Sequence, residues 1–192
     1  MNNFTPKTEL LYQKSKPIDQ LNLIDGIYLM VDEQKKAATE VKKEALAIEA
    51  AVNAIYKHLT VNLLGRLIYV GAGTSGRIGV QDGVELFPTF NWPKNRFDYI
   101  IAGGSRAIVN AIENAEDSEV LANNAVIEKL ISSEDVVVGL AASGNTPFTC
   151  KVMEKAKIKK ALTISIRNNP KGKILDFGKV KIILDTKEEV IA

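Results

Sequence analysis

Short apolar segments alternate with helical stretches from residue 64 onward, and this alternation restricts the possible folds more than any other feature of the chain. The apolar segments are nearly continuous and rich in β-branched residues, as is typical of strands that helices cover on both faces. They are residues 67–70, 99–102, 136–141, 162–166 and 180–184. Helices are predicted at residues 76–86, 106–114, 117–130 and 146–157. The pattern predicts an α/β fold with a five-stranded parallel sheet flanked by helices.

The first 60 residues predict an N-terminal arm and a helical extension, which precede a domain at residues 61–192. Residues 1–17 are polar and contain two prolines, so an extended arm is expected. Helical signal then runs to about His58, with a break near Asp32. After the break, apolar residues recur at spacings of three and four, which places them on one stripe. That stripe fits packing on the domain itself or on a partner helix. No low-complexity linker is present, so a single structural unit is expected.

The composition excludes several classes of protein. The chain has 192 residues, of which 46% are hydrophobic, and this suits one globular domain. A net charge of +2 is too small to indicate nucleic-acid binding. The single cysteine, Cys150, excludes an intrachain disulfide and is predicted to fill the core. No apolar run approaches the roughly 18 residues of a membrane span, and the N-terminus lacks a signal core, so a cytoplasmic protein without membrane association is expected.

A glycine-rich loop follows the first predicted strand in LIYVGAGTSGR, residues 67–77. Its G-x-G-x-x-G spacing matches a dinucleotide-binding loop, which also needs an acidic residue at the end of the second strand. That end reads Ala102-Gly103-Gly104-Ser105, and Asp98 precedes the strand. The dinucleotide interpretation therefore fails its confirming test, and no cofactor is predicted.

A second polar loop follows the third predicted strand, in LAASGNTP. Hydroxyl groups and amides at a helix N-terminus bind phosphate without a metal or a lysine. The carboxyl ends of parallel strands meet at one edge of the sheet, so both loops should face one anion the size of a phosphosugar. Serine and threonine are also ordinary N-caps, which explains either loop alone but explains the pair less well. The candidate ligand-binding residues are Gly73, Thr74, Ser75, Ser143, Gly144, Asn145 and Thr146.

Two glutamates are candidates for acid–base chemistry. Glu85 lies among apolar residues, so its carboxyl group is expected to be desolvated and its pKa raised. Glu116 lies in AIENAEDS between the second and third strands. A helical glutamate is more often a solvated charge, and sequence spacing alone does not bring these two residues together.

These stretches resemble the N-acetylmuramic acid 6-phosphate etherases, within the sugar isomerase (SIS) domain superfamily. The matching segments are LIYVGAGTSGRIGVQDGVE with PTF after it, IAGG, AIENAEDS and DVVVGLAASGNTP, in the family's order and spacing. Weaker agreement reaches back to Thr8-Glu9 and VDEQKKA, so the resemblance covers nearly the whole chain. It implies a three-layer SIS fold.

The resemblance also implies an activity and the residues that carry it. Such a lyase cleaves the lactyl ether of N-acetylmuramic acid 6-phosphate with water, without cofactor or metal, to give N-acetylglucosamine 6-phosphate and D-lactate in peptidoglycan recycling. By family matching, Glu85 takes the proton-donor position and Glu116 the second catalytic position; which of them removes the C2 proton stays open. Arg77 would help the two loops to hold the substrate, and a homodimer is expected.

The sequence departs from the family pattern at several places. Gly83-Val84 stands where Ala-Ser is usual, Leu86-Phe87 replaces Cys-Pro, and Asn145 replaces an arginine. The sequence ends at DTKEEVIA where family members continue, so it is either C-terminally truncated or covers the gap with other elements. Two alternatives therefore stay open: a non-catalytic phosphosugar sensor similar to the glucokinase regulatory proteins, and a sugar-phosphate isomerase.

Overall fold

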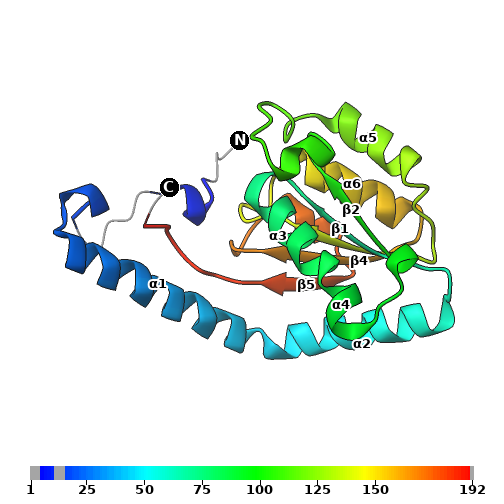
Figure 1. The fold of residues 1–192 in the computed structure, drawn as a ribbon, viewed down its shortest axis with the longest axis horizontal. Helices are drawn as coiled ribbons and strands as arrows, with labels where there is room; N and C mark the ends of the chain where they lie inside the picture. Colours follow the sequence, from blue (N-terminus) through cyan, green and yellow to red (C-terminus); the bar gives the residue numbers. More distant parts are fainter. Residues whose placement is uncertain (1–4, 11–15, 191–192) are drawn as a thin grey trace.

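The sheet that the apolar segments predict is present in the computed structural model, which describes residues 5–10 and 16–190 (Figure 1). Its five strands run parallel in the order β2-β1-β3-β4-β5. They are β1 (Leu67–Gly71), β2 (Phe97–Ile101), β3 (Val136–Leu140), β4 (Leu162–Arg167) and β5 (Val180–Ile183). Each predicted strand ends within two residues of the observed one, so the fold prediction is confirmed.

Helices cover both faces of the sheet and give three layers. Ile68, Val70 and Val137 point to the face covered by α5 (Glu119–Glu128) and α6 (Pro147–Ile158), where they join one buried cluster. Alternate residues such as Leu67 and Val138 point to the other face and pack against α2 (Ala45–Val61). The helix α3 (Gly73–Val84) shares this second face with α2, because its Gly79 lies directly over Tyr69.

The N-terminal helices form a long rod that passes beneath the sheet and extends beyond it (Figure 1). This rod consists of α1 (Leu23–Lys43) and α2, and it is interrupted at Glu44. The predicted break near Asp32 is wrong, because α1 is continuous through this residue, whose carboxylate pairs with Lys35 on an exposed helix face. One side of α2 packs on the sheet through residues that include Ile48 and Leu59. The division of the chain near residue 60 stays a prediction.

The predicted helix at 106–114 is also wrong. Only a short 3₁₀ turn forms there, at Ser105–Ile108. The Asn110 side-chain amide donates to the Arg106 carbonyl, a local bond that competes with helix formation, and Asn114 has a left-handed backbone with φ of 58°. An irregular segment therefore leads into α5, and it places Glu116 near the carboxyl edge of the sheet.

Shorter elements complete the described part of the chain. They are η1 (Lys7–Glu9), η2 (Ile18–Gln20), α4 (Leu86–Phe90), η3 (Lys94–Arg96) and η5 (Lys173–Asp176). Within the described ranges, no helix combines the length and the apolar character needed to cross a membrane.

Candidate phosphosugar site

A hollow of about 420 Å³ opens at the carboxyl edge of the sheet. This volume is within the usual range for small-molecule sites. Its walls come from the β1–α3 loop, the β3–α6 loop, the segment before α5 and the N-terminal arm. Seven of the residues expected to bind or transform a ligand line it: Gly73, Thr74, Ser75, Glu116, Ser143, Asn145 and Thr146.

The glycines of the first loop allow the strand to turn directly into α3. A Cβ at Gly71 would lie 2.7 Å from the backbone nitrogen of Gly76. Any side chain at Gly71 would therefore prevent the end of β1 from packing this closely against the first turn of α3. Gly73 opens the helix with a φ of 50°, a conformation that favours glycine. The helix therefore begins at the hollow itself, three residues earlier than predicted, and its first-turn N–H groups face that side.

The second loop is held in shape by its own polar groups. The Asn145 N–H donates to Ser143 Oγ at 3.2 Å, and Asn145 Oδ1 accepts from the Lys173 N–H at 2.9 Å. Gly144 lies between them with a φ of 77° and is buried, so it shapes the loop without lining the hollow. Thr146 and Pro147 then start α6, where proline at the first helical position costs no hydrogen bond.

Glu116 lines the hollow from the segment before α5, and its backbone is fixed there. Its carbonyl accepts from the Phe148 N–H at 2.8 Å, which ties this segment to the first turn of α6. Asp117 lines the hollow beside it. A carboxylate next to two hydroxyl-bearing loops can exchange protons with a bound ligand, which is the arrangement that acid–base chemistry requires.

The arm and the C-terminal segment add residues that the sequence analysis did not identify. Thr8 lines the hollow and its hydroxyl accepts from Asn169 Nδ2 at 3.0 Å. The Lys7 N–H donates to Asn169 Oδ1 at 2.6 Å, so this asparagine anchors the arm beside the site. Glu189 also lines the hollow, and burial raises the pKa of its carboxyl group. Among the described residues, no group of three or more His, Cys, Asp or Glu side chains is placed to hold a metal ion.

Glu85 does not line this hollow. It follows the C-terminal end of α3, and a 12-residue helix is roughly 18 Å long, so Glu85 and the first loop lie at opposite ends. The residue is exposed, and the expectation that its apolar neighbours would desolvate it is wrong for a single chain. Val84 and Phe87 are themselves exposed, and so is Phe90, with 72% of its surface accessible.

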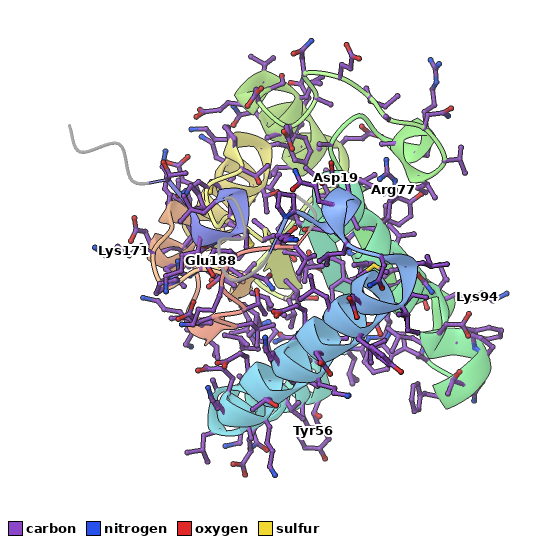
Figure 2. The ribbon with its side chains drawn as sticks, turned by 90° about the vertical axis from the view of Figure 1, so that its left-hand side faces the viewer. Asp19, Tyr56, Arg77, Lys94, Lys171 and Glu188 are labelled. Carbon is purple, nitrogen blue, oxygen red and sulfur yellow. The ribbon has the colours of Figure 1, made fainter. Side chains whose placement is uncertain are left out.

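Arg77 also points away from the hollow. Its Nε donates to the Ala107 carbonyl at 3.0 Å and its Nη2 to the Asn110 carbonyl at 3.1 Å. Figure 2 shows Arg77 beside the segment that follows β2, on the side of the molecule away from Glu188. In this chain, Arg77 therefore fixes η4 (Ser105–Ile108) and the residues after it against α3, and it is not among the residues that line the hollow.

An apolar groove runs between α2 and the segment after α4, and it lies close to Glu85 in the chain. We define it by Val52, Ile55, Tyr56, Leu59, Leu63 and Trp92. Tyr56 is 69% exposed and lies at the outer side of α2 (Figure 2). The backbone N–H of Trp92 donates to the carbonyl of Leu86, the first residue of α4 and the residue after Glu85.

The parallel sheet with helices on both faces is the architecture expected of a SIS domain, and comparison with known families agrees. Residues 47–157 match the model of the glucokinase regulatory protein N-terminal SIS domain. Because this match covers more than half of the 192 residues, the chain belongs to that SIS domain family.

Curated relatives and solved structures refine this comparison. The chain is 39% identical over 97% of its length to an N-acetylmuramic acid 6-phosphate etherase of Deinococcus radiodurans, and 37% identical over its whole length to etherase 2 of Enterococcus faecalis. It spans 60% and 64% of those two proteins, respectively. The resemblance to the etherases that the sequence motifs indicate is thus confirmed.

Among solved structures, a phosphoheptose isomerase from Francisella tularensis has a TM-score of 0.63 at 19% identity and 85% coverage of both chains. The Vibrio vulnificus NanR protein complexed with ManNAc-6P has a TM-score of 0.55 at 11% identity, over 85% of this chain and 53% of that one. These structures share the fold.

Proposed function

We propose that this chain carries the substrate site of an N-acetylmuramic acid 6-phosphate etherase, a carbon–oxygen lyase. The observation that carries the proposal is the convergence of two hydroxyl-bearing loops and Glu116 on one hollow of suitable size. The identity to etherases over nearly the whole chain supports the same activity. Thr74, Ser75, Ser143, Asn145 and Thr146 bind the phosphate and the sugar.

The reaction is an elimination followed by a hydration. In the ring-opened sugar, the C1 aldehyde acidifies the C2 proton; a carboxylate removes this proton, and the C3–O bond breaks to release D-lactate, whose oxygen accepts a proton from an acid. Water then adds to C3 of the conjugated alkene and a proton returns to C2. Substrate and water thus give N-acetylglucosamine 6-phosphate and D-lactate without oxidation or reduction.

Glu116 and Glu85 share the proton transfers, and this requires two copies of the chain. Within one copy Glu85 lies at the far end of α3 from the hollow, so Glu85 must reach the site from a second copy. The exposed Val84, Phe87 and Phe90 around it and the nearby apolar groove support a homodimer, because a surface of this kind is stabilised by burial against a partner.

The activity is tested by incubating the protein with N-acetylmuramic acid 6-phosphate and measuring D-lactate. Release of D-lactate is expected, and Glu116→Gln should reduce it by about a hundredfold or more. Glu134→Gln is a matched control, since this exposed glutamate lies at the amino edge of the sheet, away from the hollow. Absence of D-lactate from the protein, or full activity of the Glu116→Gln variant, contradicts the proposal.

Mixing two inactive variants tests the shared site. If each site takes Glu116 from one copy and Glu85 from the other, random exchange between Glu85→Gln and Glu116→Gln chains restores about a quarter of the activity, because half of the dimers are mixed and each has one intact site. If both residues act from the same copy, the mixture stays inactive.

A non-catalytic phosphosugar sensor is a second candidate, favoured by the match to the glucokinase regulatory protein model. Such a domain binds N-acetylglucosamine 6-phosphate and releases no D-lactate. The lactate assay together with a binding measurement separates the two functions.

A further inference from the structure

Arg167, the last residue of β4, is a buried cation without a partner among the residues that the structure describes. Its side chain has 0% exposure, and its Nε, Nη1 and Nη2 atoms make no hydrogen bond within the described part of the chain. Desolvation lowers the pKa of its guanidinium, but arginine stays charged in proteins. A buried charge without a partner is strongly unfavourable, so its presence calls for a compensating interaction.

The guanidinium lies directly behind the second loop of the hollow. A Cβ placed on Gly144 would be 3.0 Å from Arg167 Cδ and 3.6 Å from Nη1. Gly144 has no side chain to separate this guanidinium from the loop, and its two neighbours, Ser143 and Asn145, line the hollow. The strand ends hold this arrangement, since the Asn168 N–H donates to the Ala142 carbonyl at 3.0 Å.

The hollow itself lacks positive charge. The described residues that line it include Glu116, Asp117 and Glu189 but no lysine or arginine. A phosphate group bound there would meet three carboxyl groups on the walls and only hydroxyl and amide donors in the loops. A nearby cation would offset the repulsion between the phosphate and these carboxyl groups, and Arg167 is placed behind the loop that would hold the phosphate.

We propose that Arg167 supplies the positive charge of this anion site from behind the Ser143–Asn145 loop, as a positioning residue that recognises phosphate without lining the hollow. The inference rests on the proposed phosphosugar function, of which it names the electrostatic component. It explains at once why a guanidinium is buried without a partner and how an acidic hollow accepts a phosphorylated sugar.

The test compares ligand affinity with stability in the full chain. Calorimetric titration with N-acetylglucosamine 6-phosphate and with inorganic phosphate should show about a tenfold or greater loss of affinity in Arg167→Met, while Arg167→Lys keeps most of it. Urea unfolding of Arg167→Met without ligand should show equal or greater stability than the wild type, because an unpaired buried charge is removed. Lys173→Met is the matched control, since it removes an exposed cation from the adjacent loop and should leave affinity unchanged.

If Arg167→Met binds phosphate with wild-type affinity, the inference is overturned. It is also overturned if the variant loses affinity only because it is less stably folded. If Arg167→Met does not fold, the Nε–H resonance of Arg167 in the wild type is followed during a phosphate titration. A shift that saturates with the ligand supports the inference, and an unmoved resonance at saturation overturns it. The failure of this inference can be told apart from the failure of the proposed function. If phosphate binding depends on Arg167 but the protein releases no D-lactate, the inference is supported and the etherase activity is contradicted.

Discussion

Replacing Asp135 with asparagine tests how the amino edge of the sheet is held together. Asp135 is 2% exposed, and its Oδ1 accepts from the backbone N–H and Nε of Arg66 at 3.0 and 3.1 Å. Its Oδ2 accepts from Arg66 Nη2 at 3.0 Å and from the Ser132 N–H at 2.9 Å. Asparagine has one oxygen in place of two, so two of these four donors lose their acceptor. Hydrogen bonds to charged groups contribute about 1.5–3 kcal/mol each, and the partial exposure of Arg66 reduces the sum, so we expect a loss of about 2–4 kcal/mol at pH 7.

The pH dependence of this stability loss is a second, independent test of the Asp135 hydrogen bonds. Burial raises the pKa of Asp135, but the hydrogen bonds from Arg66 and Ser132 outweigh it, and the net pKa lies below its usual value. The stabilisation is therefore present above the unfolded pKa of about 3.9 and is lost as the pH falls through the lower folded pKa. Urea unfolding of both proteins should show a difference that is constant near neutral pH and shrinks below about pH 4. Asp32→Asn, in an exposed ion pair on α1, should show no measurable change. Equal stability of Asp135→Asn and wild type at pH 7, or a difference that persists undiminished in acid, would contradict this role of the Asp135 carboxylate.

Two further predictions concern the core and the first loop. Burial raises the pKa of the Cys150 thiol to about 11, so few of these thiols are ionised at pH 8. An aromatic disulfide reagent at pH 8 should therefore react slowly with the native protein and rapidly in denaturant. Fast reaction with the native protein would contradict the predicted core position. Gly71→Ala would place a methyl group 2.7 Å from the Gly76 backbone nitrogen. Urea unfolding should therefore show that the free energy of unfolding falls by about 1–3 kcal/mol, and calorimetry should show a weaker phosphosugar affinity. An unchanged affinity would mean that the start of α3 does not hold the ligand.

The sequence predicted the sheet and the two loops because their signals are local. Nearly continuous apolar runs such as Val136–Leu140 are typical of strands that helices cover on both faces. Glycine and serine directly after a strand favour a polar loop. The 106–114 helix failed because a local bond at Asn110 and the left-handed Asn114 outweigh helix propensity there.

Parts of the site depended on contacts that sequence reasoning does not reach. Thr8 and Asn169 meet across 161 positions of the chain. Apolar neighbours in sequence suggested a desolvated Glu85, yet those neighbours lie on the surface of the single chain, because sequence proximity does not determine burial. Arg167 looks like an ordinary charge at a strand end, and only its packing against Gly144 reveals a buried guanidinium.

Both loops are proposed to bind the same phosphosugar, and backbone NMR of the ¹⁵N-labelled chain tests this directly. On titration with N-acetylglucosamine 6-phosphate, the amide resonances of Thr74, Ser75, Ser143 and Asn145 should shift together with one dissociation constant. Shifts confined to one loop, or two loops that titrate with different constants, would contradict the shared site.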